Sequence, residues 1–110
     1  MANRVLVVDA HADSRLWLAE ALQLRDFQVS GVASGREAID GDFEPDLVIL
    51  ELQMPDLDGY ATLAELRKSS APPPVIALSG HVLPDDELRI RESGFEAALS
   101  KPVDLETLYR

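Results

Sequence analysis

Short apolar runs alternate with amphipathic stretches along the whole chain. The apolar runs, rich in β-branched residues, predict strands over residues 5–8, 27–32, 46–50, 75–78 and 95–99. The stretches between and after them predict helices over residues 14–25, 34–41, 58–68, 84–93 and 104–110. Strands that alternate with helices in this way are typical of a parallel sheet with helices on both faces.

Polar residues at the expected helix starts predict where several helices begin. Ser34 followed by Glu37 matches the capping-box pattern, and Asp58 is expected to cap the third helix. Asp13 or Ser14 is the expected cap of the first helix.

Helical spacing also predicts which face of the first helix is buried. Trp17 shares this spacing with Leu18, Ala21 and Leu22, so we expect the indole to lie in the core. Just after this helix, Asp26 stands where a left-handed backbone conformation is common.

Composition narrows the class of protein. The length of 110 residues is that of one domain, expected over residues 1–110, and its last helix is so short that a further region could follow it. The absence of cysteine excludes disulfides, thiolate zinc sites and a cysteine nucleophile. A net charge of −10 disfavours nucleic-acid binding.

No apolar run approaches the ~20 residues of a membrane span, and no signal peptide precedes the first strand, so a cytoplasmic location is expected.

Four chemically active side chains directly follow four of the predicted strands. They are Asp9, Glu51, Ser79 and Lys101. The carboxyl ends of parallel strands meet at one edge of the sheet, which is where such sheets bind ligands. Two acids, a hydroxyl and an ammonium group can hold a divalent cation and a phosphoryl group there. A polar rim in which each charge is solvated is the alternative.

Two histidines lie near this edge. His11 can join Asp9 and Glu51 as an imidazole and carboxylate metal site, although a solvated loop histidine is the commoner case and is our expectation. His81 follows the fourth strand, and we expect a surface loop residue there rather than a partner contact.

Four segments resemble, in order and spacing, the receiver domains of bacterial two-component response regulators. They are VLVVD at residues 5–9, PDLVILELQMPDLDG at 45–59, VIALSG at 75–80 and GFEAALSKP at 94–102. The resemblance implies a flavodoxin-like, CheY-like α/β fold: a three-layer sandwich whose five parallel strands have the order 2-1-3-4-5. It also implies a signalling module rather than an enzyme. Such domains accept a phosphoryl group from a histidine kinase onto an aspartate, with Mg²⁺ as cofactor.

Three positions depart from the pattern that the resemblance implies. Ala10 replaces the second acid of a pair that binds metal, Glu51 replaces the phosphoryl-accepting aspartate, and Ala98 replaces the aromatic switch residue. Ser79 and Lys101 match the family's hydroxyl and lysine, and the backbone carbonyl of Gln53 falls at the position of a metal ligand. The remaining metal set would be Asp9, Glu51 and Gln53.

These departures favour an atypical receiver that has lost phosphorylation, or nearly so, and binds a protein partner without a cofactor. The resemblance places the partner surface on the fourth helix, fifth strand and fifth helix. The partner would be a histidine kinase, a phosphotransfer protein, an output domain or a second copy of the chain.

Three alternatives stay open. Glu51 is a residual phosphoryl acceptor with Mg²⁺, or its longer side chain reaches Lys101 and Ser79 and mimics the phosphorylated state. In the third alternative, the old site binds a different small ligand or cation.

Overall fold

Five strands and four helices alternate in the part of the chain that the computed structural model describes, residues 3–41, 43–54, 57–69, 72–80 and 84–100. They are β1 (Arg4–Val8), α1 (Ala12–Gln23), β2 (Gln28–Val32), α2 (Gly35–Asp40), β3 (Leu47–Glu51), α3 (Gly59–Leu66), β4 (Val75–Ser79), α4 (Pro84–Glu92) and β5 (Ala97–Ser100). The expected last helix, 104–110, lies outside the described residues, as do Lys101 and His81.

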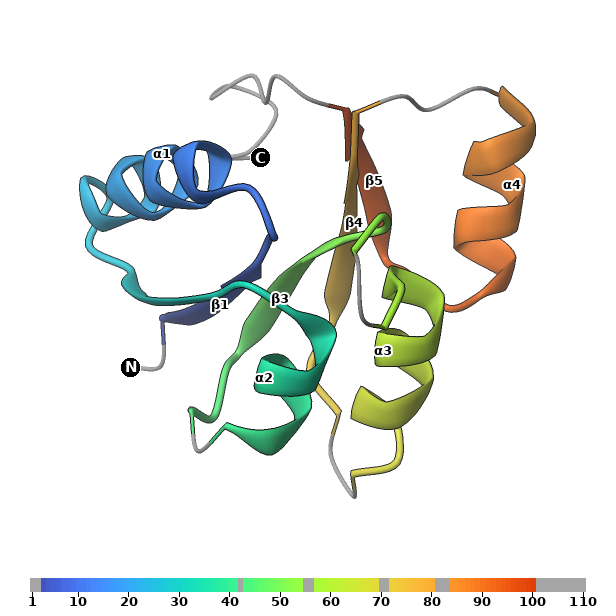
Figure 1. Cartoon of the computed structure of the whole chain (residues 1–110), viewed down its shortest axis with the longest axis horizontal. Helices are drawn as coiled ribbons and strands as arrows, with labels where there is room; N and C mark the ends of the chain where they lie inside the picture. Colours follow the sequence, from blue (N-terminus) through green and yellow to red (C-terminus); the bar gives the residue numbers. More distant parts are fainter. Residues whose placement is uncertain (1–2, 42, 55–56, 70–71, 81–83, 101–110) are drawn as a thin grey trace.

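The strands form one parallel sheet in the order β2-β1-β3-β4-β5, which confirms the predicted flavodoxin-like topology. Among the described helices, α1 covers one face of the sheet, whereas α2, α3 and α4 cover the other (Figure 1). β1 and β3 lie in the middle of the sheet and are buried on both faces, which is why their sequences are continuous apolar runs.

The core is divided by the sheet into two clusters. Side chains of α1 pack with alternate residues of the strands on one face, and side chains of α2, α3 and α4 pack with the others. The first cluster contains Leu18 and Leu22 of α1, and the second contains Leu63 of α3 and Ile90 of α4. Each buried strand residue therefore belongs to the cluster on the face of the sheet toward which its side chain points.

Three expectations about α1 are wrong. The helix begins at Ala12 rather than near residue 14, and its N-cap residue is His11, not Asp13 or Ser14. The cause is Asp9, whose carboxylate accepts the His11 N–H at 2.9 Å and closes the turn just before the helix. Trp17 is 45% exposed, because Leu18 and its i+3 and i+4 neighbours face the sheet and the indole lies at the flank of that stripe.

The other boundary signals are confirmed. The Ser34 hydroxyl accepts the Glu37 N–H at 3.2 Å, while the Glu37 carboxylate accepts the Ala33 N–H at 3.0 Å. The Asp58 carboxylate accepts the Ala61 N–H at 2.8 Å at the start of α3. Asp26 has the expected left-handed conformation, with φ of 67°. Within the described residues, no helix has the length and apolar character needed to cross a membrane.

Replacing Ser34 by alanine tests the capping box. Ser34→Ala removes the acceptor for the Glu37 N–H, so we expect the free energy of unfolding to fall by about 1 kcal/mol in urea titrations followed by circular dichroism. Ser69→Ala, at an exposed serine in a bend, is the matched control and should change it by less than about 0.5 kcal/mol. Equal urea midpoints of unfolding for the two variants would contradict a stabilising role of the Ser34 cap.

Candidate functional site

Strand register brings two acids to the same level of the sheet edge. Val8 pairs with Leu50, so the next residues, Asp9 and Glu51, stand beside one another at the carboxyl ends of β1 and β3. Both are buried, with exposed fractions of 0% for Asp9 and 3% for Glu51. The sequence prediction that these two acids converge therefore agrees with the placement of the two strands.

Asp9 is held by both its backbone and its side chain. Its N–H donates to the Val32 carbonyl at 3.1 Å, and its carbonyl accepts from Arg15 Nη1 at 2.8 Å. Its Oδ1 accepts the His11 N–H. These bonds connect the end of β1 to β2 and α1, so the Asp9 carboxylate has little freedom to move.

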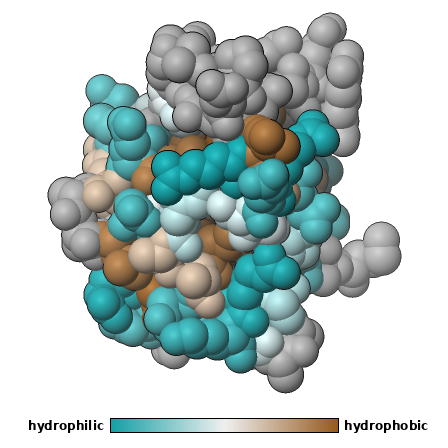
Figure 2. All heavy atoms as spheres, turned by 90° about the vertical axis from the view of Figure 1, so that its right-hand side faces the viewer, coloured by the Kyte–Doolittle hydropathy of each residue, from teal (hydrophilic) through white to brown (hydrophobic). Residues whose placement is uncertain are grey.

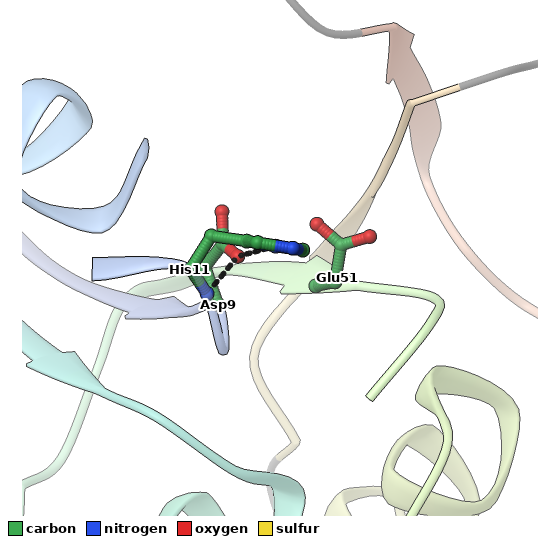
Figure 3. A group of neighbouring side chains, drawn as sticks. All are labelled: Asp9, His11 and Glu51. Atoms are coloured by element: carbon green, nitrogen blue, oxygen red, sulfur yellow. Dashed lines mark hydrogen bonds and ion pairs between the residues drawn. The ribbon is translucent and has the colours of Figure 1, made fainter. Parts of the chain in front are cut away.

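His11 is turned back toward the two acids. Its side chain is 71% exposed, as expected for a loop histidine, yet its Nδ1 lies 3.4 Å from Asp9 Oδ1. Figure 3 shows the imidazole ring reaching from the loop before α1 toward Glu51. One ligand atom from each of Asp9, His11 and Glu51 lies within 4.8 Å of the other two. The expectation of a solvated histidine therefore agrees with the exposure of His11 but does not account for the direction of its ring, which points toward the two acids.

The backbone after Glu51 is fixed by a close approach to α3. The Gly59 N–H donates to the Leu52 carbonyl at 2.9 Å. A Cβ at Gly59 would lie 2.8 Å from the Glu51 carbonyl oxygen and 2.7 Å from the Leu52 Cα, so only glycine fits. The first turn of α3 thus packs directly against the end of β3 that carries Glu51.

Ser79 and Gln53 line a pocket next to this cluster. Ser79 ends β4 and is buried, whereas the side chain of Gln53 is exposed in the loop after β3. The pocket has a volume of about 610 Å³ and is lined by Leu52, Gln53, Met54, Asp58, Tyr60, Ser79, Arg89 and Ile90. The structure therefore places Ser79 at the sheet edge, as predicted, on the wall of a space between α3 and α4.

Ala98 lies in β5 opposite Ala77 and is half-buried against the core. The nearby aromatic contacts come from other elements. The Arg89 guanidinium lies 4.2 Å from the centre of the Tyr60 ring, and Tyr60 contacts Phe95 edge-on with ring centres 5.9 Å apart. The sequence does not indicate the stacking of Arg89 on Tyr60, because the two residues are far apart in sequence and match no local motif.

The cluster of Asp9, His11 and Glu51 can bind a divalent cation. Its two carboxylates and its imidazole are all metal ligands, and burial of the two acids strengthens their attraction for a cation.

Comparison with known proteins gives consistent matches over nearly the whole chain. The response regulator receiver domain family matches residues 5–110. The transcriptional regulatory protein PrrA of Mycobacterium tuberculosis is 36% identical over 107 residues, covering 96% of this chain and 46% of PrrA. The regulatory protein AtoC of Escherichia coli is 31% identical over 108 residues, covering 96% of this chain and 23% of AtoC. The chain thus spans less than half the length of these curated relatives.

Solved structures show the same fold. The signal receiver domain of a LuxO repressor protein from Vibrio parahaemolyticus is 26% identical, with a TM-score of 0.90, covering 99% of this chain and 85% of that one. The receiver domain of a Francisella response regulator is also 26% identical, with a TM-score of 0.87, covering 96% of this chain and 89% of that one. From the match over residues 5–110, the strand order and these relatives, we conclude that the chain belongs to the response regulator receiver domain family.

Proposed function

We propose that this receiver domain acts in two-component signalling as a protein-interaction module whose phosphorylation is lost or strongly impaired. The observation that carries the proposal is the pair of substitutions at the site: Glu51 ends β3 at the acceptor position, and Ala10 follows Asp9 at the position of a metal-binding acid. A cytoplasmic setting remains part of the proposal.

The donor set argues against efficient use of Mg²⁺. Receiver domains typically bind Mg²⁺, and the acidic pair of Asp9 and Glu51 is present in this chain. Mg²⁺ requires near-octahedral coordination by oxygen. Ala10 offers no side-chain oxygen, and the third ligand beside the two acids is the imidazole of His11. We therefore infer that the described residues fit Mg²⁺ poorly.

The acceptor position argues in the same direction. Glu51 has one more methylene than an aspartate, which shifts its carboxylate by about 1.5 Å. Phosphoryl transfer depends on in-line positioning, and a misplacement near 1 Å can cost about a hundredfold in rate. Mimicry of the phosphorylated state by Glu51 would be partial, because a phosphoryl group brings nearly two charges and three oxygens.

The absence of an aromatic switch residue at Ala98 also supports the proposal. Ala98 has no ring that could rotate between two positions, so the usual two-state aromatic element is missing from β5. The stacking of Arg89 on Tyr60 instead joins α4 to α3. This contact does not involve the acceptor position, and it supports an α4 whose placement is independent of phosphorylation.

The proposed partner surface is the face formed by α4 and β5, with the expected last helix. On α4, Leu88 is 61% exposed and the neighbouring Arg89 and Arg91 are also exposed. Figure 2 views the side of the molecule on which α4 lies, where hydrophilic groups surround smaller hydrophobic areas. An exposed leucine on a helix that carries both acids and arginines suits a kinase, a phosphotransfer protein or an output domain with an apolar contact and a rim of complementary charges. A second copy of the chain is the other candidate.

The loss of phosphorylation chemistry is tested with beryllofluoride, a phosphoryl mimic that needs Mg²⁺. We expect amide NMR spectra of the domain to stay unchanged on adding Mg²⁺ and beryllofluoride, because Ala10 and Glu51 disrupt the donor set. The double variant Ala10→Asp with Glu51→Asp should show shifts around Asp9, Ser79 and the end of β3.

Each single variant serves as the control for the double variant. A response of the unmodified domain would show that Glu51 still supports the chemistry, and the residual-acceptor alternative would then replace the proposal. A double variant that stays silent would mean that other positions caused the loss.

The link between α3 and α4 is tested by Arg89→Ala. Loss of the guanidinium over Tyr60 should lower the free energy of unfolding by about 0.5–1 kcal/mol and speed amide hydrogen exchange in α4. Arg91→Ala removes an exposed arginine from the same turn of α4 and should leave exchange unchanged. Indistinguishable exchange in the two variants would show that the stacking does not hold α4.

A further inference from the structure

We propose that Asp9, His11 and Glu51 form a mixed nitrogen and oxygen site for a first-row transition-metal dication of the Zn²⁺ type, in preference to Mg²⁺. This inference goes beyond the proposed interaction module, because it assigns a ligand to the site. It stands whether or not Glu51 accepts a phosphoryl group.

Rotation of side chains in the cluster can bring its three ligand atoms to the distances that one ion requires. Zn²⁺ binds nitrogen and oxygen ligands tetrahedrally at about 2.0–2.2 Å, so two ligands of one ion are about 3.3–3.6 Å apart. The ligand atoms of Asp9, His11 and Glu51 lie within 4.8 Å of one another. Ligand atoms at the upper end of this range must therefore approach one another by about 1.3 Å, and the exposed ring of His11 can make this movement by side-chain rotation.

The kind of donor decides which metal is preferred. Where the resemblance to receivers places a second acid, this chain has Ala10, and the next residue brings an imidazole to the same carboxylates. Imidazole nitrogen is a good ligand for Zn²⁺, Ni²⁺ and Cu²⁺, whereas Mg²⁺ takes oxygen ligands almost exclusively. The replacement of an oxygen donor by a nitrogen donor thus changes the selectivity of the site.

The surroundings of the cluster favour binding. The carboxylates of Asp9 and Glu51 are buried side by side, so a dication between them is attracted in a medium of low dielectric. The bonds from the His11 N–H to Asp9 Oδ1 and from Arg15 to the Asp9 carbonyl orient the loop that carries two of the ligands. On the other side, the exposed His11 leaves a route from solvent for the ion.

Three protein ligands leave at least one coordination position open. Such open sites are found where a metal binds a further molecule, whereas structural zinc sites are closed by four protein ligands. The site is therefore suited to an ion that also accepts water or an oxygen atom of a partner.

Isothermal titration calorimetry of the purified 110-residue chain tests the site with ZnCl₂ and MgCl₂. We expect one Zn²⁺ per chain, bound more tightly than Mg²⁺ by at least about tenfold. His11→Gln should weaken Zn²⁺ binding by about tenfold or more, because even loss of an outer-shell partner of a metal ligand costs that much. His81→Gln, at the only other histidine, is the matched control and should bind as the unmodified chain does.

Glu51→Gln keeps the shape of the side chain but loses its charge, and it should also weaken Zn²⁺ binding. Far-UV circular dichroism checks that each variant is folded, and amide NMR spectra with Zn²⁺ should shift first at Asp9, His11 and Glu51. Unaltered Zn²⁺ affinity in His11→Gln, loss of binding in His81→Gln, or tighter binding of Mg²⁺ than of Zn²⁺ would each overturn the proposal. Tighter binding of Mg²⁺ than of Zn²⁺ would also remove the donor-set argument for impaired phosphorylation. The results for His11→Gln and His81→Gln do not bear on the beryllofluoride experiment, so failure of the metal site and failure of the proposed signalling role remain distinguishable.

Discussion

The in-register pairing of β1 with β3 determines where every group of the site stands. It places Asp9 level with Glu51, and it does so in the middle of the sheet, where both acids are shielded from water. Because side chains alternate along a strand, a slip of one residue would move Glu51 to the opposite face and separate the two acids. The buried apolar runs of β1 and β3 prevent this slip, since it would also move their core residues out of place.

Most of the fold could be predicted from the sequence because its signals are local. The apolar run that ends at Asp9 marks a buried strand, and Ser34 and Asp58 mark helix starts through hydrogen bonds to residues three positions away. The start of α1 was missed because it depends on a side chain outside the helix, the carboxylate of Asp9. The stacking of Arg89 on Tyr60 could not be predicted, because it joins two helices whose contact only the folded sheet creates.

The convergence of the two acids could be predicted from the sequence, whereas the direction of His11, which we expected to be solvated, could not. The acids follow from the strand ends, whereas the direction of His11 follows from the turn that Asp9 closes. This turn couples the site to β1 and α1, while the pocket at Ser79 belongs to α3 and α4. A ligand bound by Asp9, His11 and Glu51 would stabilise the start of α1. A partner bound to α4 would contact the helices on the other face of the sheet. The proposed ligand site and the proposed partner surface therefore lie on different elements of the domain.

The half-exposed Trp17 has a consequence for spectroscopy. It is the only tryptophan of the chain, and it lies on α1. His11 is the N-cap residue of this helix, and Asp9 lies two residues before His11. An indole already in contact with water changes its emission only weakly when the chain unfolds. Its emission and its quenching by iodide are instead sensitive to anything that covers the flank of α1 on which it lies. The native chain thus carries its own fluorescent reporter for that helix, without a label.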